Sequence, residues 1–241
     1  MLRVAALQYC ASDDIAKTLH HIQPLIAEAA SKASLVALPE CANYLAASRE
    51  QLFQKAEWDD ESYSQKWLGN IAREFGIWLL AGSLIMRRRD NNRLVNRSLL
   101  FGPDGAVVAD YDKIHMFDAD VGDGKMYRES ASFSAGQSPV IAHIDNVPCG
   151  LTICYDVRFA HLYRQLALDG AQLFLVPAAF TALSGKAHWH VLLRARAIET
   201  GCYIVAPAQS GTHADGRKTY GHSLIINPWG EILAEAKDDD S

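Results

Sequence analysis

Three residues spread along the sequence carry the groups that an acyl-transfer reaction needs. Glu40, Lys113 and Cys154 offer a carboxylate, an ammonium group and a thiol. A thiol can attack a carbonyl carbon, a carboxylate can take the thiol proton and return it to a leaving amine, and a fixed cation can stabilise the oxyanion. Each residue closes a short apolar run that predicts a β-strand. Because the carboxyl ends of strands joined by crossover helices share one edge of a sheet, we expect the three side chains to meet there.

Cys154 lies where an apolar strand pattern passes directly into a helical pattern, within residues 150–159. On such a turn the sulfur lies at the mouth of the sheet, where backbone N–H groups and a helix N-terminus favour the thiolate and can hold an oxyanion. Singly, each residue has an ordinary structural alternative: a buried small hydrophobe for Cys154, a solvated strand-end acid for Glu40, and a surface lysine with a packed stem for Lys113. Only their combination indicates catalysis.

The segments around these residues alternate between strand and helix patterns. Two β-rich runs joined by Gly-Pro-Asp-Gly predict a hairpin, and residues 114–136, which include Glu129, keep no period and predict a long functional loop. The alternation indicates an α/β fold in which helices cover the sheets. The hairpin runs are 94–101 and 106–111, the other predicted strands are 2–8, 34–38, 77–84, 140–144, 147–153, 171–176, 203–208, 224–227 and 232–236, and the predicted helices are 15–29, 62–75, 159–168 and 187–200.

The composition limits the classes to which the protein can belong. With 241 residues and a net charge of −5, the chain fits one large α/β domain. A sequence pI near 6.0 gives no basic footprint for nucleic acid or anionic membranes. No apolar run reaches the ~18–20 residues of a membrane helix, and the N-terminus lacks the basic region of a signal peptide. The five cysteines lack CxxC spacing, which argues against a disulfide framework and a thiolate zinc site, so we expect a cytoplasmic protein.

Three segments of the sequence resemble the signature segments of the nitrilase superfamily of carbon–nitrogen hydrolases. They are Leu-Pro-Glu at 38–40, Tyr-Asp-Lys-Ile-His-Met-Phe-Asp at 111–118, and residues 150–159. The resemblance covers nearly the whole chain in order, and it carries the superfamily's Glu-Lys-Cys triad onto Glu40, Lys113 and Cys154. Residues 128–136 resemble the segment that supplies a second, positioning glutamate, so Glu129 inherits that role.

The resemblance implies a single carbon–nitrogen hydrolase domain over residues 1–241. Its fold would be a four-layer α-β-β-α sandwich of the nitrilase type, dimerised through helices that flank the active site. Further segments are most similar to the Nit branch, whose nearest members look like deaminated-glutathione amidases, with the ω-amidases close by; they are residues 187–189, 192–199, 220–223 and 227–230. Two features depart from that branch. His190 replaces its usual glutamate, and the sequence stops at Ser241, where relatives continue into an arm that crosses the dimer. We expect that arm to be absent, either because the sequence is short or because that part of the interface is missing.

These residues suggest that an amide is hydrolysed in two steps, without a metal or an organic cofactor. In this hypothesis Glu40 takes the proton of Cys154 and the thiolate attacks the amide carbonyl. The Lys113 ammonium and the backbone N–H of Tyr155 stabilise the oxyanion. Glu40 then protonates the leaving amine and activates the water that hydrolyses the thioester. Glu129 steers Lys113 through its charge.

The sequence indicates the residues that contact the substrate less clearly than it indicates Glu40, Lys113 and Cys154. Arg158 follows the cysteine on the next helical turn, where it could bind a substrate carboxylate or, equally, pair with Asp156. Phe117 and Phe180 are candidate walls of the substrate pocket, or plain core residues. The expected partner is a small carboxylate-bearing amide such as deaminated glutathione. Amides of the 2-oxoglutaramate type and N-carbamoyl amino acids are the alternatives.

Other kinds of function fit less well. A papain-like Cys-His pair lacks its sequence signatures, although the chain has nine histidines. A metal site formed by His188 and His190 is disfavoured because residues two apart on a helix point away from each other. His222 is predicted to make a structural hydrogen bond. A binding or scaffold protein on the same frame is the non-enzymatic alternative.

Overall fold

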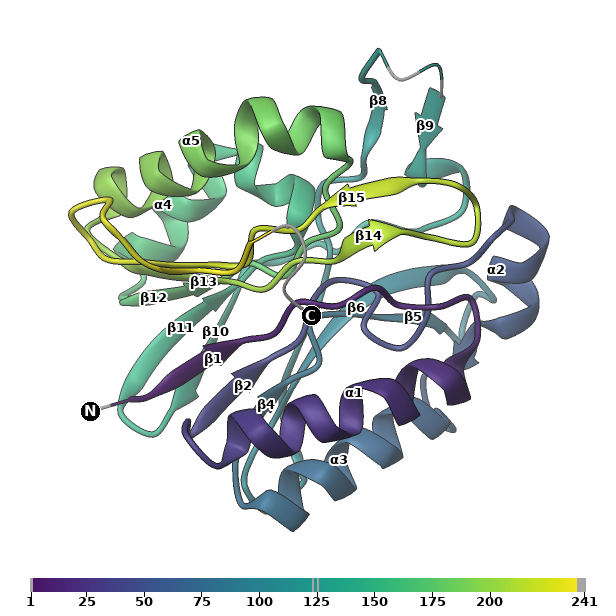
Figure 1. Cartoon of the computed structure of the whole chain (residues 1–241), viewed down its shortest axis with the longest axis horizontal. Helices are drawn as coiled ribbons and strands as arrows, with labels where there is room; N and C mark the ends of the chain where they lie inside the picture. Colours follow the sequence, from purple (N-terminus) through teal and green to yellow (C-terminus); the bar gives the residue numbers. More distant parts are fainter. Residues whose placement is uncertain (1, 123, 125, 238–241) are drawn as a thin grey trace.

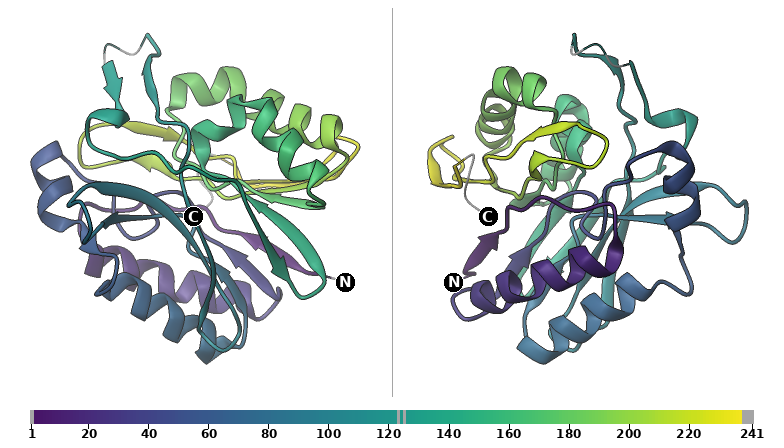
Figure 2. Two further views of the ribbon diagram at one scale, coloured as in Figure 1. Left: turned by 180° about the vertical axis from the view of Figure 1, so that it is seen from behind. Right: turned by 45° about the vertical axis from the view of Figure 1, so that its right-hand side comes forward.

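Two β-sheets lie face to face between two pairs of helices, so the fold has four layers in the order α, β, β, α (Figure 1). The computed structural model describes residues 2–122, 124 and 126–237. Figure 2 shows the same layers from behind and from one side. The predicted four-layer α/β sandwich is confirmed. The prediction about a C-terminal arm concerns the end of the chain, and residues 238–241 lie outside the described part.

The first sheet has seven strands and is covered by α1 (Ile15–Ala30) and α3 (Tyr63–Phe75). Asp14 caps the start of helix α1, because its carboxylate accepts a hydrogen bond from a backbone N–H of the first turn. The buried face of the helix packs on the sheet. The strands lie in the order β1 (Val4–Ala6), β2 (Leu35–Ala37), β4 (Trp78–Leu80), β6 (Leu94–Phe101), β5 (Leu84–Arg87) and β3 (Glu57–Trp58), and β7 (Val107–Asp112) also pairs with β6.

The second sheet has six strands and is covered by α4 (Ala160–Leu168) and α5 (Ala182–Thr200). Its strands lie in the order β10 (Val140–Ile144), β11 (Val147–Leu151), β12 (Leu173–Leu175), β13 (Tyr203–Ala206), β16 (Leu224–Ile226) and β17 (Ile232–Glu235). The strands β11, β12 and β13 are parallel, as crossover helices require. None of the helices in the described part of the chain combines the length and apolar composition that crossing a bilayer requires.

Some elements differ from the sequence prediction because they are short or capped by polar residues. Residues 114–136 contain the hairpin of β8 (Asp118–Asp120) and β9 (Met126–Arg128), followed by the 3₁₀ turn η1 (Glu129–Ala131). Helix α5 starts at Ala182, earlier than predicted, because the Thr181 side chain caps it. The short elements α2 (Arg49–Lys55) and β3 carry too few residues to show a period. A hairpin of β14 (Ser210–Thr212) and β15 (Lys218–Tyr220) flanks the polar turn predicted at 211–216.

The strand predicted at 77–84 is interrupted and continues further than expected. Its two parts, β4 and β5, both pair with β6, but the register changes from Leu80 opposite Leu100 to Leu84 opposite Arg97. At the interruption lies Gly82, where a Cβ atom would stand 2.0 Å from the carbonyl oxygens of residues 38 and 39. Only glycine allows this close approach of two backbones, immediately before Glu40.

The strand directions bring the predicted catalytic residues to one edge. Strand β2 is parallel to β4, β6 is antiparallel to β4, and β7 is antiparallel to β6. Strands β2 and β7 therefore run in the same direction. Glu40 follows β2 and Lys113 follows β7, so both side chains start from the same edge of the first sheet. Cys154 follows β11 of the second sheet and is the first residue of the 3₁₀ turn η2 (Cys154–Arg158).

Candidate active site

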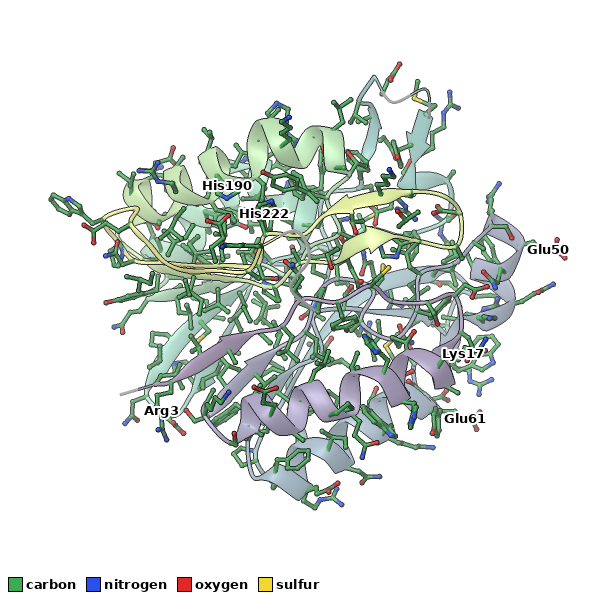
Figure 3. All side chains as sticks on the ribbon, viewed as in Figure 1. Arg3, Lys17, Glu50, Glu61, His190 and His222 are labelled. Atoms are coloured by element: carbon green, nitrogen blue, oxygen red, sulfur yellow. The ribbon has the colours of Figure 1, made fainter. Side chains whose placement is uncertain are left out.

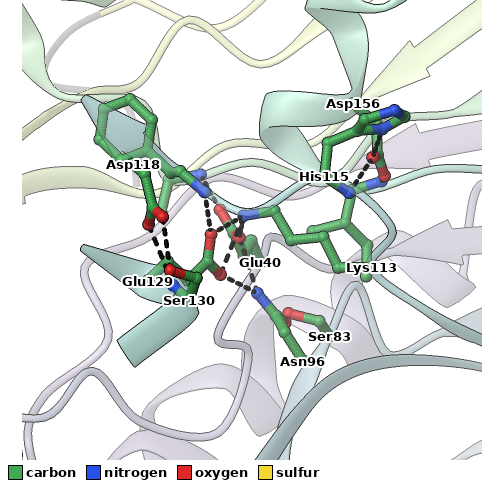
Figure 4. A network of polar contacts seen from close by, with 12 residues as sticks. Glu40, Ser83, Asn96, Lys113, His115, Asp118, Glu129, Ser130 and Asp156 are labelled. Carbon is green, nitrogen blue, oxygen red and sulfur yellow. Dashed lines mark hydrogen bonds and ion pairs between the residues drawn. The ribbon is translucent and has the colours of Figure 1, made fainter. Parts of the chain in front are cut away.

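A buried ammonium group binds two carboxylates at the edge of the first sheet (Figure 4). The Nζ atom of Lys113 lies 3.0 Å from Oε1 of Glu40 and 2.9 Å from Oε2 of Glu129. Lys113 is 2% exposed and Glu40 is 4% exposed, so water screens these charges little. The structure thus brings together Glu40, Lys113 and Glu129, which the sequence analysis placed in one site.

Neutral donors complete the binding of both carboxylates. The Nδ2 atom of Asn96 donates to Oε1 of Glu40 at 2.9 Å and to Oε1 of Glu129 at 3.3 Å. The backbone N–H of Ala179 donates to Oε2 of Glu40 at 2.9 Å, and that of Phe117 donates to Oε2 of Glu129 at 2.7 Å. These bonds fix the orientation of each carboxylate. Sequence reasoning missed Asn96, which stands with Arg97 and Ser98 in a short polar stretch between the apolar ends of strand β6 and is not marked out from them by any pattern.

Cys154 faces the same cavity as the charged groups. A cavity of about 570 Å³ is lined by Glu40, Lys113, Glu129 and Cys154 together. The backbone of Cys154 has a φ angle of 49°, in the left-handed region that non-glycine residues rarely adopt. Its N–H donates to the carbonyl oxygen of Pro177 at 2.9 Å, which helps to hold this conformation. Three residues from distant parts of the sequence therefore converge.

The surrounding charges set the protonation states in this cavity. Burial alone would raise the pKa of Glu40, but Lys113 and hydrogen bonds from Cys154 and Asn96 lower it. Burial alone would lower the pKa of Lys113, yet Glu129 and Glu40 raise it well above its usual value. Burial and the charge of Glu40 raise the pKa of the Cys154 thiol well above its usual value, and Lys113 offsets this only in part. The resting site therefore holds a neutral thiol, and the prediction that the turn favours the thiolate is wrong for this state.

A second buried carboxylate fixes the turn that carries the cysteine. Asp156 accepts hydrogen bonds through Oδ2 from the Tyr111 hydroxyl at 2.7 Å and from the Ile153 N–H at 2.8 Å. Through Oδ1 it accepts from the His115 N–H at 3.1 Å, and the Nδ1 atom of the same residue lies 2.7 Å away. These bonds tie η2 to the end of β7 and to the residues after it (Figure 4). Asp156 thus holds the cysteine in register with the lysine.

Arg158 lines a neighbouring cavity of about 560 Å³. Its guanidinium carbon lies 5.6 Å from the ring centre of Tyr155 and 5.4 Å from that of Phe180, and an Nη atom lies 3.2 Å from Nδ1 of His188. Among the described residues, Arg158 and Phe180 are absent from the lining of the Cys154 cavity, and Asp156 is bound to other partners, so the alternative of an Arg158–Asp156 pair is wrong.

Of the aromatic and histidine candidates, only Phe117 lies at the cysteine cavity. Phe117 lines both cavities and so borders the cysteine site. Phe180 is buried, with its ring centre 4.9 Å from that of Trp189. His188 and His190 have different neighbours: His188 contacts Arg158, whereas Nε2 of His190 lies 2.9 Å from a carboxylate of β17. The two histidines therefore face different parts of the structure.

Three arginines that the sequence analysis did not single out line the cysteine cavity. They are Arg49, Arg128 and Arg217. Arg217 pairs with Asp215 at 3.3 Å, and its Nε atom is buried with no hydrogen-bond partner among the described residues. Among the described residues near these three guanidinium groups, Asp215 is the one acid in the lining besides Glu40 and Glu129. This part of the cavity is therefore positive, which favours a negatively charged ligand. The arginines lie outside the main strands and helices of the sandwich, so no motif marks them.

Comparisons with known proteins show what this chain resembles. Residues 3–241 match the carbon–nitrogen hydrolase family. The deaminated glutathione amidase of Synechocystis sp. is 44% identical over 236 residues, which are 96% of this chain and 86% of that protein. The crystal structure of the C. elegans NitFhit protein gives a TM-score of 0.92 at 34% identity and covers 100% of this chain, which spans 59% of that longer one. A mutant of the amidase from Nesterenkonia sp. AN1, with acrylamide added to its active-site cysteine, gives a TM-score of 0.86 at 26% identity, covering 100% of this chain and 91% of that one.

The substitution Asp156→Asn tests the bracing of the cysteine turn. It replaces one acceptor oxygen by an NH₂ group, and because each carboxylate oxygen accepts from a backbone N–H, at least one buried donor loses its partner. We expect the free energy of unfolding, measured by urea denaturation, to fall by about 2–4 kcal/mol. The matched control is Asp169→Asn at the exposed end of α4, which should change it by less than about 0.5 kcal/mol. Equal stability of Asp156→Asn and the parent would contradict the bracing role.

Proposed function

The chain belongs to the carbon–nitrogen hydrolase family, and we propose that it hydrolyses the amide bond of a small carboxylate-bearing molecule through a thioester on Cys154. One observation carries this proposal. A thiol, a carboxylate and an ammonium group line a single cavity, and Glu129 and Asn96 hold the two charged groups in place. This set of groups provides a nucleophile, a proton carrier and a stabilising cation for acyl transfer.

The first half of the proposed reaction forms the thioester. Glu40 accepts the Cys154 proton as the sulfur attacks the amide carbonyl carbon, so the thiolate forms only when it bonds to carbon. The Lys113 ammonium and the N–H of Tyr155 stabilise the oxyanion. When the tetrahedral intermediate collapses, the C–N bond breaks and Glu40 gives its proton to the leaving amine.

The second half restores the enzyme. A water molecule loses a proton to Glu40 and attacks the thioester carbonyl, and the same cation and N–H stabilise the second oxyanion. The C–S bond then breaks, the sulfur recovers the proton from Glu40, and the carboxylic acid leaves. Glu40 therefore acts as base, acid, base and acid in turn. Because its pKa lies below the usual value, Glu40 is ionised at neutral pH and can accept a proton.

The substrate we propose is an amide with carboxylates, of which deaminated glutathione is the model. Glutathione carries a carboxylate at each end, and removal of its amino group leaves a molecule with excess negative charge. Arg49, Arg128 and Arg217 make the cysteine cavity suitable for such an anion. The relative with 44% identity is named for this substrate. Arg158, in the cavity that shares Phe117 with the cysteine site, is a second place where a carboxylate of an extended substrate can bind.

We also propose that the protein works as a homodimer in the cytoplasm. Leu183, Val191 and Ile198 of α5 are 52%, 68% and 56% exposed, and their spacing puts them on one side of the helix. An exposed apolar strip of this kind is typical of a surface that a second chain covers. The five cysteines are free thiols, as in proteins of a reducing compartment.

Cys154→Ala and Glu40→Gln test the thioester mechanism. Each should lower kcat by about three or more powers of ten, and the double variant should lose little more because the groups act as a unit. The assay measures ammonia or amine released from 2-oxo acid amides, N-carbamoyl amino acids and short peptidyl amides. Cys202→Ala, which removes a buried thiol bound to the Ala171 carbonyl oxygen, is the control and should retain activity. Parental turnover by Cys154→Ala, or no acyl adduct on Cys154 by mass spectrometry, would refute the mechanism.

Arg217→Gln and Arg158→Gln test how the substrate carboxylate is recognised. Losing a charged hydrogen bond costs about 1.5–3 kcal/mol, so Arg217→Gln should raise KM for a carboxylate-bearing amide by about 10–100-fold. KM for the uncharged methyl ester of the same amide should change little. If only Arg158→Gln shows this charge-selective effect, the carboxylate lies in the neighbouring cavity and the assignment to Arg217 is wrong.

The mass of the protein in solution tests the proposed dimer. Multi-angle light scattering should give twice the chain mass of 26.5 kDa. Val191→Glu, which places a charge on the exposed strip, should shift the mass toward one chain because a buried unpaired charge is costly. A monomeric parent protein would contradict the proposal.

A further inference from the structure

Two histidines and a glutamate from three separate elements converge beside α5, and neither the proposed hydrolysis nor the sequence analysis uses them as a group. His190 lies on α5, His222 precedes β16, and Glu235 ends β17. Oε1 of Glu235 lies 2.9 Å from Nε2 of His190 and 2.7 Å from Nδ1 of His222. Figure 3 shows the two histidines side by side between α5 and the last strands of the chain.

The chemistry of this cluster matches a zinc site. One ligand atom from each residue lies within 4.8 Å of the others. Zinc bonds of ~2.0–2.2 Å to imidazole nitrogen and carboxylate oxygen place ligand atoms some 3–4 Å apart in a tetrahedral site, so small side-chain rotations suffice. Two histidines and one glutamate form a known zinc ligand set that leaves the fourth position to water. On binding, each imidazole offers the lone pair of the nitrogen now facing Glu235 and keeps its proton on the other ring nitrogen.

The positions of the three ligands are fixed by the fold before any ion binds. The Trp189 indole N–H donates to the His222 carbonyl oxygen at 2.8 Å, and the Tyr220 ring stacks on the His222 ring with centres 4.3 Å apart. Glu235 is held beside them by the pairing of β16 with β17, in which it lies opposite Leu224. A metal would therefore meet ligands that the fold already brings close together, and binding would restrict the edge strand further.

We propose that His190, His222 and Glu235 bind a Zn²⁺ ion that clamps the last strand of the second sheet to α5. The need for such a clamp follows from the strand itself, because all four residues of β17 are exposed and it pairs only with β16 among the described strands. Within the described part of the chain, none of the three ligands lines the Cys154 cavity. In this proposal the ion, with water as its fourth ligand, holds the strand to the helix, and its site is separate from the Cys154 cavity.

Isothermal titration with ZnCl₂ tests the proposal, in a Cys154→Ala background so that the active-site thiol does not bind the metal. We expect one Zn²⁺ per chain. His190→Gln, Glu235→Gln and His222→Asn should each weaken binding by more than about 100-fold, because loss of a ligand should exceed the 10–100-fold effect of losing a ligand's support. Asparagine is chosen at residue 222 because it tolerates the φ angle of 54°. The control is His143→Ala, which removes an exposed histidine of β10 and should bind as the parent does.

A second measurement separates metal binding from a simple ion-pair network. Zinc at 100 times its dissociation constant should raise Tm by about 5–10 °C in the parent, and EDTA should reverse the shift. The three ligand variants should show no zinc-dependent shift, even where their own Tm is changed. Absence of stoichiometric binding in the parent, or unchanged affinity in the ligand variants, would overturn the proposal and leave these residues as an ion-pair network only.

Discussion

The ion pairs of Lys113 are the interactions on which the rest of the site depends. An ammonium group that is almost fully buried needs opposite charge and hydrogen bonds in good geometry, and Glu40 and Glu129 supply both. Each carboxylate in turn needs donors, which come from Asn96 and two backbone N–H groups. The charged groups thus hold one another in place, because removal of one leaves another buried charge with fewer partners.

The site also depends on the contact between the two sheets. Glu40 and Lys113 follow strands of the first sheet, whereas Cys154 follows a strand of the second. Glu40 is bound from the second half of the chain as well, by the Ala179 N–H at 2.9 Å and by the Gln209 amide, which donates to its carbonyl oxygen at 3.0 Å. The distance between the Cys154 sulfur and the Glu40 carboxylate is therefore as rigid as the packing between the sheets.

The sequence predicts what local pattern can encode and misses what only the folded chain creates. Glu40, Lys113 and Cys154 were found because each ends a strand and lies in a characteristic segment. Asn96 and Asp156 were missed as site residues because their roles depend on partners far away in the chain. The same limit explains the interruption at Gly82, where a backbone from another part of the chain approaches. Arg217 lies in a hairpin turn with no period, and only the fold brings it to the cavity.

The raised pKa of Cys154 has a consequence for how the thiol meets oxidants. Peroxides react with thiolates and hardly with thiols, so a buried thiol that keeps its proton is a poor target for conversion to sulfenic acid. In the proposed reaction the sulfur becomes reactive only when a carbonyl carbon is present to receive it. The carboxylate that would take the thiol proton thereby also shields the sulfur while the cavity holds no substrate.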